Sequence, residues 1–194
     1  MQTTNTMKKA NTKMIIMAAI FAAVTAICSQ IQIPLAPVPV NLATFAVFIT
    51  AGLLGSRYGT ISMLVYVMLG AVGAPVFAGF TGGFGIITGP TGGYIIGYIF
   101  AALVTGLVIE KSAPKSNPMT APSVLMLILA MVLGLGVCYL LGTIWFIHLT
   151  GWTLGKSLMT CVVIFLPGDA LKIAAATILI KKLYPTSRRF SQSM

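Results

Sequence analysis

Long apolar runs with almost no charge are the feature that most constrains how this chain folds. Of its 194 residues, 58% are hydrophobic and only 7% are charged, and the only acids are Glu110 and Asp169. A soluble domain carries roughly a quarter of its residues as charged side chains. The composition therefore excludes a water-soluble globule and indicates a chain whose main solvent is lipid.

Six apolar segments are candidates for membrane-spanning helices, because one span needs about 20 apolar residues. They cover residues 14–33, 42–55, 60–77, 94–109, 123–149 and 168–183, and the second of them is short. Lipid cannot satisfy backbone polar groups, so only helices and closed barrels cross it. The runs are continuous, whereas barrel strands alternate apolar and polar residues. We therefore predict an all-α membrane protein with six transmembrane helices in one domain, residues 14–184.

Basic residues gather at alternate ends of the predicted spans. Ten of the twelve fall on one side, namely Lys8, Lys9, Lys13, Arg57, Lys111, Lys115, Lys181, Lys182, Arg188 and Arg189. The positive-inside rule makes that side cytoplasmic, so residues 1–13 and 185–194 are predicted to be cytoplasmic tails. A net charge of +10 is also typical of nucleic-acid binding. Because the basic residues lie at span ends and no polar domain presents them, we expect no nucleic-acid partner.

Three other patterns point to functions that their details do not support. Residues 1–29 resemble a signal peptide, but five further spans follow, so we interpret them as an uncleaved first helix. The stretch "GWTLGKS", residues 151–157, is one residue too short for a phosphate loop and follows no strand. The three cysteines lack metal-ligand spacing, and His148 is the only histidine. We expect no metal, no cofactor and no enzymatic activity.

A loop on the predicted outer side is rich in proline. It reads "IPLAPVPVN", residues 33–41, and its three prolines favour a stiff, extended segment with few backbone donors. We interpret this loop, which ends at Asn41, as an outer flap.

A second outer loop is rich in glycine. The sequence "FAGFTGGFGIITGPTGGY", residues 77–94, holds seven glycines, and such residues as Gly82 and Gly83 allow a ligand to approach the backbone closely. Phe77, Phe84 and Tyr94 add flat apolar surface beside them. This composition favours a small-molecule pocket, and a flexible hairpin without a ligand is the alternative.

The run "FLPGDALK" places an acid and a base inside the last apolar segment. Pro167 disfavours helical geometry at the preceding residue, which predicts a last helix that begins near Gly168 after a shallow segment, residues 158–166. Asp169 and Lys172 then lie on one helical face. Each costs roughly 2.5 to 3.5 kcal/mol at the membrane centre.

Two interpretations of this pair remain open. Mutual neutralisation or capping of the helix is the purely structural one. Intramembrane ionisable residues more often mark a substrate or ion path. An acid that accepts N–H groups, beside an ammonium that binds a carboxylate, suits a small, amide-like, acidic solute.

Four stretches resemble the BioY family in their order and spacing: "IPLAPVPVN", "GLLGSRYGTIS", "GAPVFAGFTGGFGIITGPTGGYIIGY" and "FLPGDALK". This family comprises the biotin-specific substrate-binding (S) components of energy-coupling factor (ECF) vitamin transporters. The resemblance covers nearly the whole chain. It implies a six-helix protein of the prokaryotic plasma membrane that captures biotin from outside. It also implies partners that help to pass biotin inward, a transmembrane (T) subunit and two ATPase subunits.

The resemblance also implies which residues contact biotin. The family's polar contacts match Asp169, Lys172 and Thr81, a position where some members have Asn. Some members carry Arg directly after "GPTGGY", whereas this chain has Ile95, which leaves Lys172 and backbone N–H groups for the carboxylate. We expect Asp169 to accept from the ureido N–H groups, Lys172 and Thr81 to hold oxygen atoms, and the aromatic residues and the flap to cover the rings.

The first span carries a stripe of small residues that permits close helix approach. Its members are Ala18, Ala22 and Ala26, with Ala19 and Ala23 beside them. By resemblance, this stripe docks the T subunit. Tight packing within the chain's own bundle is the alternative.

Other transport functions compete with this one. An S component for riboflavin or thiamin would share the architecture but should lack "GPTGGY" and "PGDALK" together. A stand-alone solute transporter is usually larger and shows internal repeats with paired broken helices. An S component that works without ATPases remains open.

Overall fold

The computed structural model describes residues 2–35, 38–114 and 119–192, with side chains from residue 12 to residue 190. Its long helices are α1 (Gln2–Gln30), α2 (Ala43–Ala71), α4 (Gly92–Ser112), α5 (Val124–Thr150) and α7 (Leu166–Gln192). The short elements are β1 (Gln32–Ile33), β2 (Val40–Asn41), α3 (Phe84–Thr88), α6 (Leu154–Leu158) and the π-helical turn η1 (Met159–Val163). Lys115, residues 36–37 and the side chains of Lys8 and Lys9 lie outside this description.

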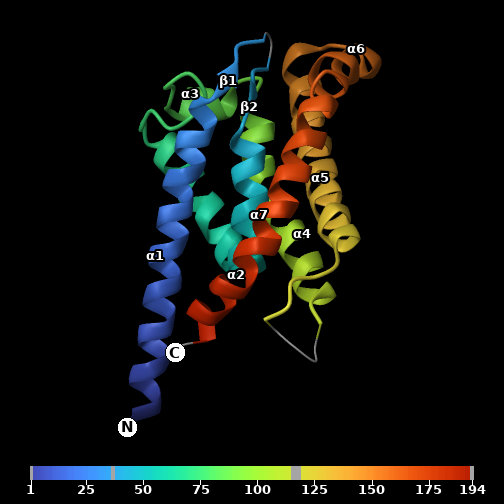
Figure 1. Cartoon of the computed structure of the whole chain (residues 1–194). Coiled ribbons are helices and arrows are strands. Elements are labelled where there is room, and N and C mark those ends of the chain that lie inside the picture. The colour runs from blue at the N-terminus through green and yellow to red at the C-terminus, as the bar shows by residue number, and fades with distance from the viewer. Residues whose placement is uncertain (1, 36–37, 115–118, 193–194) are drawn as a thin grey trace.

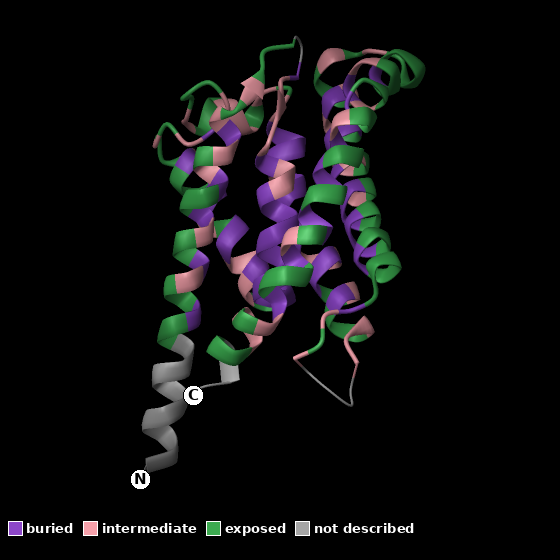
Figure 2. Cartoon of the chain, viewed as in Figure 1, coloured by how far each residue is buried: buried purple, intermediate pink, exposed green. Residues whose placement is uncertain are grey.

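The long helices form one bundle (Figure 1). Helix α4 packs against α2 and α5, and α2 also contacts α1 and α7. The start of α1 and the end of α7 lie at one end of the bundle, while the β1–β2 hairpin, α3 and α6 lie at the other. Buried residues line the inward faces of the helices, and the outward faces are largely exposed (Figure 2). This pattern fits a protein whose outer surface meets lipid.

Helix α2 is broken at Gly55, which separates the two segments predicted over residues 42–55 and 60–77. Gly55 has φ 78° and ψ −175°, and the positive φ favours glycine because it has no Cβ. The second half ends at Ala71, earlier than predicted. Gly73 with φ 105° turns the chain there, and Pro75 has no backbone N–H for a helical bond.

Helix α7 begins at Leu166, two residues before the predicted start at Gly168. Pro167 therefore lies in the first turn, where a missing N–H costs nothing because that donor has no intrahelical partner. The predicted shallow segment corresponds to α6 and η1, which are bent by 41° from α7. At its other end, α7 continues across Pro185 to Gln192, beyond the predicted end at residue 183.

Three helical stretches of the described chain are long and apolar enough to cross a membrane: Thr12–Gln30, Gly92–Ser112 and Val124–Thr150. The bent pair Leu154–Val163 and Leu166–Phe190 would be a fourth if it forms one span. The break at Gly55 leaves each half of α2 shorter than a full span. The chain is thus a helical protein with several candidate membrane spans, and the count of six stays a prediction.

The small-residue stripe of α1 faces mainly into the protein. Ala18 and Ala22 are each only 1% exposed, and the Ser62 hydroxyl of α2 donates to the Ala18 carbonyl over 2.8 Å. Small side chains let the two helices approach this closely. Ala26 is half-buried, whereas Ala19 and Ala23 are exposed. Ala18 and Ala22 therefore pack within the bundle, as the alternative interpretation of the stripe has it, whereas Ala19 and Ala23 lie on the surface.

Candidate ligand-binding site

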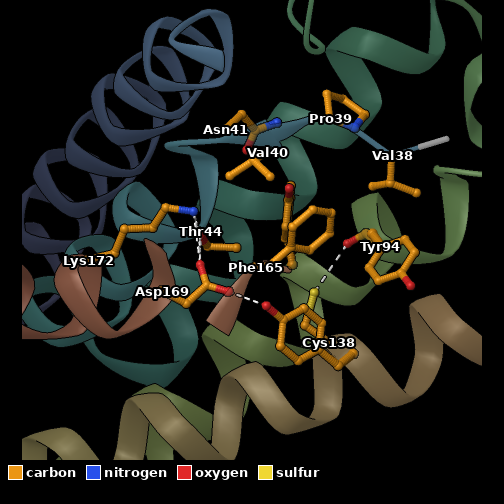
Figure 3. Close-up of a pocket in the computed structure, with 12 residues that line it drawn as sticks. Val38, Pro39, Val40, Asn41, Thr44, Tyr94, Cys138, Phe165, Asp169 and Lys172 are labelled. Carbon is orange, nitrogen blue, oxygen red and sulfur yellow. Dashed lines mark hydrogen bonds and ion pairs between the residues drawn. The ribbon is translucent and has the colours of Figure 1, made fainter. Parts of the chain in front are cut away.

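Asp169 and Lys172 form a buried ion pair near the start of α7. The Lys172 Nζ atom lies 2.9 Å from Asp169 Oδ1, across one helical turn. Asp169 is 2% exposed and Lys172 is 9% exposed. Figure 3 shows both side chains pointing toward the same small cavity. The pair brings opposite charges together away from solvent.

Two further hydroxyl groups complete the hydrogen bonding of the pair. Thr44, at the start of α2, accepts from Lys172 Nζ over 3.1 Å and donates to Asp169 Oδ1 over 3.4 Å. Tyr139 of α5 donates to Asp169 Oδ2. Both carboxylate oxygens therefore have donors, as buried charges require. Three helices meet at this network.

Sequence reasoning missed Thr44 and Tyr139. A weak signal existed for each, since Tyr139 carries a polar tip inside the apolar run 123–149 and Thr44 lies three residues after the end of the flap. Neither signal indicates that these residues contact α7, because only the bundle geometry brings Thr44 and Tyr139 to Asp169, which lies 125 and 30 positions further along the chain.

A narrow cavity of about 40 Å³ adjoins the ion pair, and we call it the constriction. Its other walls are residues of the flap, aromatic side chains and one cysteine: Val38, Pro39, Val40, Asn41, Tyr94, Tyr98, Cys138 and Phe165 (Figure 3). The described residues of the proline-rich flap thus line the same cavity as the charged pair. Its two ends pair as antiparallel strands, with Gln32 opposite Asn41 and Ile33 opposite Val40.

A larger cavity of about 200 Å³ continues from the constriction, and we call it the chamber. The two share Val38, Pro39, Asn41, Tyr94 and Tyr98. The remaining walls come mostly from the glycine-rich loop and its neighbours: Tyr66, Phe77, Ala78, Thr81, Ile86, Thr91 and Ile95. No described residue that lines the chamber carries a charge. The site therefore combines a neutral, aromatic chamber with a charged constriction.

Six residues that the sequence predicts for the site line one or both cavities. They are Asn41, Phe77, Thr81, Tyr94, Asp169 and Lys172. The Tyr94 ring packs on Gly142 of α5, and its hydroxyl lies 3.2 Å from the Thr143 hydroxyl. Phe77 packs on Gly70 and meets the Tyr66 ring edge-on at 5.5 Å between centroids. These contacts fix the aromatic walls in place.

Three other predicted site residues line neither cavity. Phe84 begins α3 and is 69% exposed. Gly82 lies so close to the Ala74 backbone that a Cβ would not fit. Gly83 adopts φ 101° and donates its N–H to the Gly70 carbonyl over 2.7 Å. The two glycines therefore shape the turn into α3, and their contact with a ligand stays a prediction.

Gln30 ties the flap end of α1 to the glycine-rich loop, and sequence reasoning missed it. Its side-chain amide donates to the carbonyls of Val76 and Phe77 over 3.2 and 3.1 Å. Its carbonyl oxygen accepts from the Phe80 N–H over 2.8 Å. Phe80 has φ 55°, which is uncommon for a residue with a side chain. One glutamine thus holds the loop that forms a wall of the chamber.

The phosphate-loop-like stretch has a different environment from a nucleotide site. Lys156 of α6 lies 3.8 Å from the centre of the Trp152 ring, a cation–π contact. All three cysteines in the described chain are free. Within the same residues, no three His, Cys, Asp or Glu side chains come together as a metal site would require.

Known proteins resemble this chain over most of its length. Residues 2–189 match the BioY family. A probable biotin transporter BioY from Pyrococcus horikoshii is 36% identical over 171 residues, which cover 88% of this chain and 96% of that protein. A biotin transporter BioY from Rhizobium etli is 30% identical over 87% of this chain and 91% of the relative.

A solved structure is similar in both fold and sequence. It is the crystal structure of the S-component for biotin from an ECF-type ABC transporter. The two chains superpose with a TM-score of 0.79 and 28% identity, over 89% of this chain and 91% of the other. The family match and the extent of these relatives agree with one another. The chain is a member of the BioY family.

Proposed function

We propose that this protein is the biotin-binding S component of an ECF transporter. It captures biotin from the outside and passes it inward together with a T subunit and two ATPase subunits. Biotin is the transported ligand, no cofactor takes part, and ATP acts only through the partner subunits. The observation that carries the proposal is the buried Asp169–Lys172 pair at one end of an uncharged aromatic chamber. The relatives named as biotin transporters support it.

The two parts of the site match the two ends of biotin. The fused rings occupy the chamber, where Phe77, Tyr94 and the flap supply flat apolar surface and Thr81 supplies a hydroxyl. The carboxylate lies at the constriction, beside Lys172. The ammonium donates to Asp169 and Thr44, which leaves one of its three N–H groups for the ligand.

This placement changes the expected role of Asp169. Lys172, Thr44 and Tyr139 already donate to its two oxygens, so its first task is to hold those donors in position. Direct acceptance from the ureido N–H groups, as expected from the family resemblance, is the alternative orientation. Biotin methyl ester distinguishes the two orientations. Esterification removes the ligand charge that faces Lys172 only when the carboxylate lies at the constriction, so only that orientation predicts weaker binding of the ester.

The same proposal includes the arrangement in the membrane. Six crossings result if each half of α2 counts as one, and both termini lie in the cytoplasm of a prokaryotic cell. Two observations support it: the start of α1 and the end of α7 share one end of the bundle (Figure 1), and most basic residues of the sequence are predicted at that end. The site then opens toward the outside. Ala19 and Ala23 remain candidates for contact with the T subunit.

Competition binding to the purified protein tests the substrate. We expect labelled biotin to bind and to be displaced by unlabelled biotin, while riboflavin and thiamin displace nothing at the same concentration. If labelled biotin does not bind and riboflavin or thiamin does, the result would support an S component for another vitamin instead.

A further inference from the structure

A third cavity lies on the outside of the bundle, between the flap hairpin and α7. It is a groove of about 500 Å³, and its walls are almost entirely apolar. Ile33 of the hairpin and Leu171 of α7 are 62% and 74% exposed, and Phe45 and Ala175 also line the groove. Such a surface suits an apolar occupant.

This groove and the binding site are separated by very little protein. Val40, Asn41 and Lys172 line both the groove and the constriction. Asn41 also lines the chamber. The three cavities therefore follow one another in the order chamber, constriction, groove, and the wall between the last two is one hairpin strand and the Lys172 side chain. A ligand whose rings occupy the chamber points its other end at this wall.

The charges at the constriction suit an amide as well as a carboxylate. Asp169 and Lys172 carry opposite charges, so a ligand carboxylate that accepts from Lys172 also lies near the negative charge of Asp169. An amide in the same place adds no charge. Its carbonyl accepts from Lys172, and its N–H donates to Asp169. That carboxylate has about four acceptor positions, and Thr44, Tyr139 and Lys172 donate to three of them.

We propose that the site also binds carboxamide conjugates of its ligand, in which the amide lies beside the Asp169–Lys172 pair and an unbranched alkyl chain lies in the groove. This inference rests on the proposed function, because the ligand's rings must occupy the chamber. The occupant follows from position: the groove lies across Val40, Asn41 and Lys172 from the constriction, where the ligand's carboxyl end is proposed to lie. It must be apolar because the groove offers almost no polar surface.

Competition against labelled biotin in lipid nanodiscs tests the inference. The probes are unlabelled biotin, biotin N-methylamide and biotin N-hexylamide, each added to the full-length protein. We expect the hexylamide to displace labelled biotin with an affinity within about tenfold of biotin. It should bind more tightly than the methylamide, because each methylene buried in the groove leaves water.

Two matched variants locate the alkyl chain. Ala175→Phe fills the groove, and Ala174→Phe adds the same ring to the neighbouring exposed residue of α7, which does not line it. We expect the first to weaken hexylamide binding at least about tenfold while biotin and methylamide binding stay unchanged. The second should change none of the three affinities.

Three outcomes would overturn the inference. If biotin displaces the label and the hexylamide does not, amide conjugates are excluded while the proposed function stands. If both Phe variants affect the hexylamide equally, the alkyl chain lies elsewhere and the groove holds membrane lipid only. If labelled biotin itself does not bind, the proposed function fails and the inference falls with it.

Discussion

At the scale of single residues, the site depends on a network of four groups that no one helix can provide. Asp169 and Lys172 come from α7, Thr44 from α2 and Tyr139 from α5. Removal of one partner from a buried charge costs more than the bond itself, because the remaining charge stays desolvated. The arrangement therefore couples the position of Lys172 to groups on two other helices.

Substitution of Tyr139 tests this coupling. Tyr139→Phe removes the donor to Asp169 Oδ2 and keeps the ring, so we expect biotin affinity to fall by roughly five- to 50-fold. In an Asp169→Asn background the same substitution should add less than about twofold, since the charged acceptor is gone. Affinities of the four proteins, measured by calorimetry, give the coupling. Equal effects of Tyr139→Phe in both backgrounds would show that the two side chains act independently.

The sequence predicted the charged members of this network and missed the neutral ones. Asp169 and Lys172 stand out because charge inside an apolar run is rare and costly. Thr44 and Tyr139 carry no such signal, since hydroxyl groups are common in membrane helices. Gly82, Gly83 and Phe84 were predicted from composition alone, and composition cannot distinguish a glycine that lines a cavity from one that shapes a turn.

At the scale of helices, the second acid of the chain stabilises the break in α2. Glu110 of α4 accepts from the Ser56 N–H over 2.9 Å and from the Ser56 hydroxyl over 2.7 Å. Ser56 follows the break at Gly55, where the backbone donors of the second half of α2 lack helical partners. Gly106, one turn earlier on α4, allows the two backbones to approach closely. Glu110 therefore caps a helix that begins in the middle of α2.

Loss of this cap should lower stability. We expect Glu110→Ala to reduce the free energy of unfolding by roughly 0.5 to 2 kcal/mol, the usual effect of a lost helix cap. Glu110→Gln should lose less, because its carbonyl still accepts one bond. Thermal unfolding in detergent measures both, with Lys111→Ala at the next, exposed position as control. A Glu110→Ala protein as stable as the Lys111→Ala control would show that the contacts with Ser56 do not stabilise the break.

The small-residue stripe of α1 gives a second prediction for helices. Ala18→Leu should destabilise the isolated protein by at least about 1 kcal/mol, because Ala18 is buried against α2. Ala19→Leu and Ala23→Leu should leave that stability unchanged and weaken assembly with the T subunit. Melting temperatures and co-purification of the complex separate the two effects. If Ala18→Leu disturbs only co-purification, α1 must leave α2 when the complex forms.

At the scale of the whole molecule, the distribution of charge predicts the orientation of the bundle. A reporter that fluoresces only in the cytoplasm, fused after the C-terminus, should be bright. Alkaline phosphatase, which is active only outside, should be active when fused after Thr150, at the end of α5. The reverse pair of results would invert the orientation and place the flap and both cavities on the cytoplasmic side.

The fold was predicted more completely than its details. Helices α4 and α5 lie within a few residues of the predicted segments 94–109 and 123–149, because long uninterrupted apolar runs have one stable form in lipid. The starts of α7 and of the second half of α2 were predicted less accurately. They depend on how Pro167 and Gly55 are accommodated, and that is settled by contacts with other helices.

Titration calorimetry of biotin into the purified, ligand-stripped protein, with wild type beside Asp169→Asn, tests the central claim most directly. The substitution keeps the size of the side chain and removes the charge that holds Lys172, Thr44 and Tyr139 together. We predict tight binding to the wild type and a loss of at least about 100-fold in the variant. A folded wild-type protein that releases no heat and does not compete for labelled biotin would contradict the assignment of biotin. Tight binding that is unchanged by Asp169→Asn would contradict the placement of the site at the start of α7.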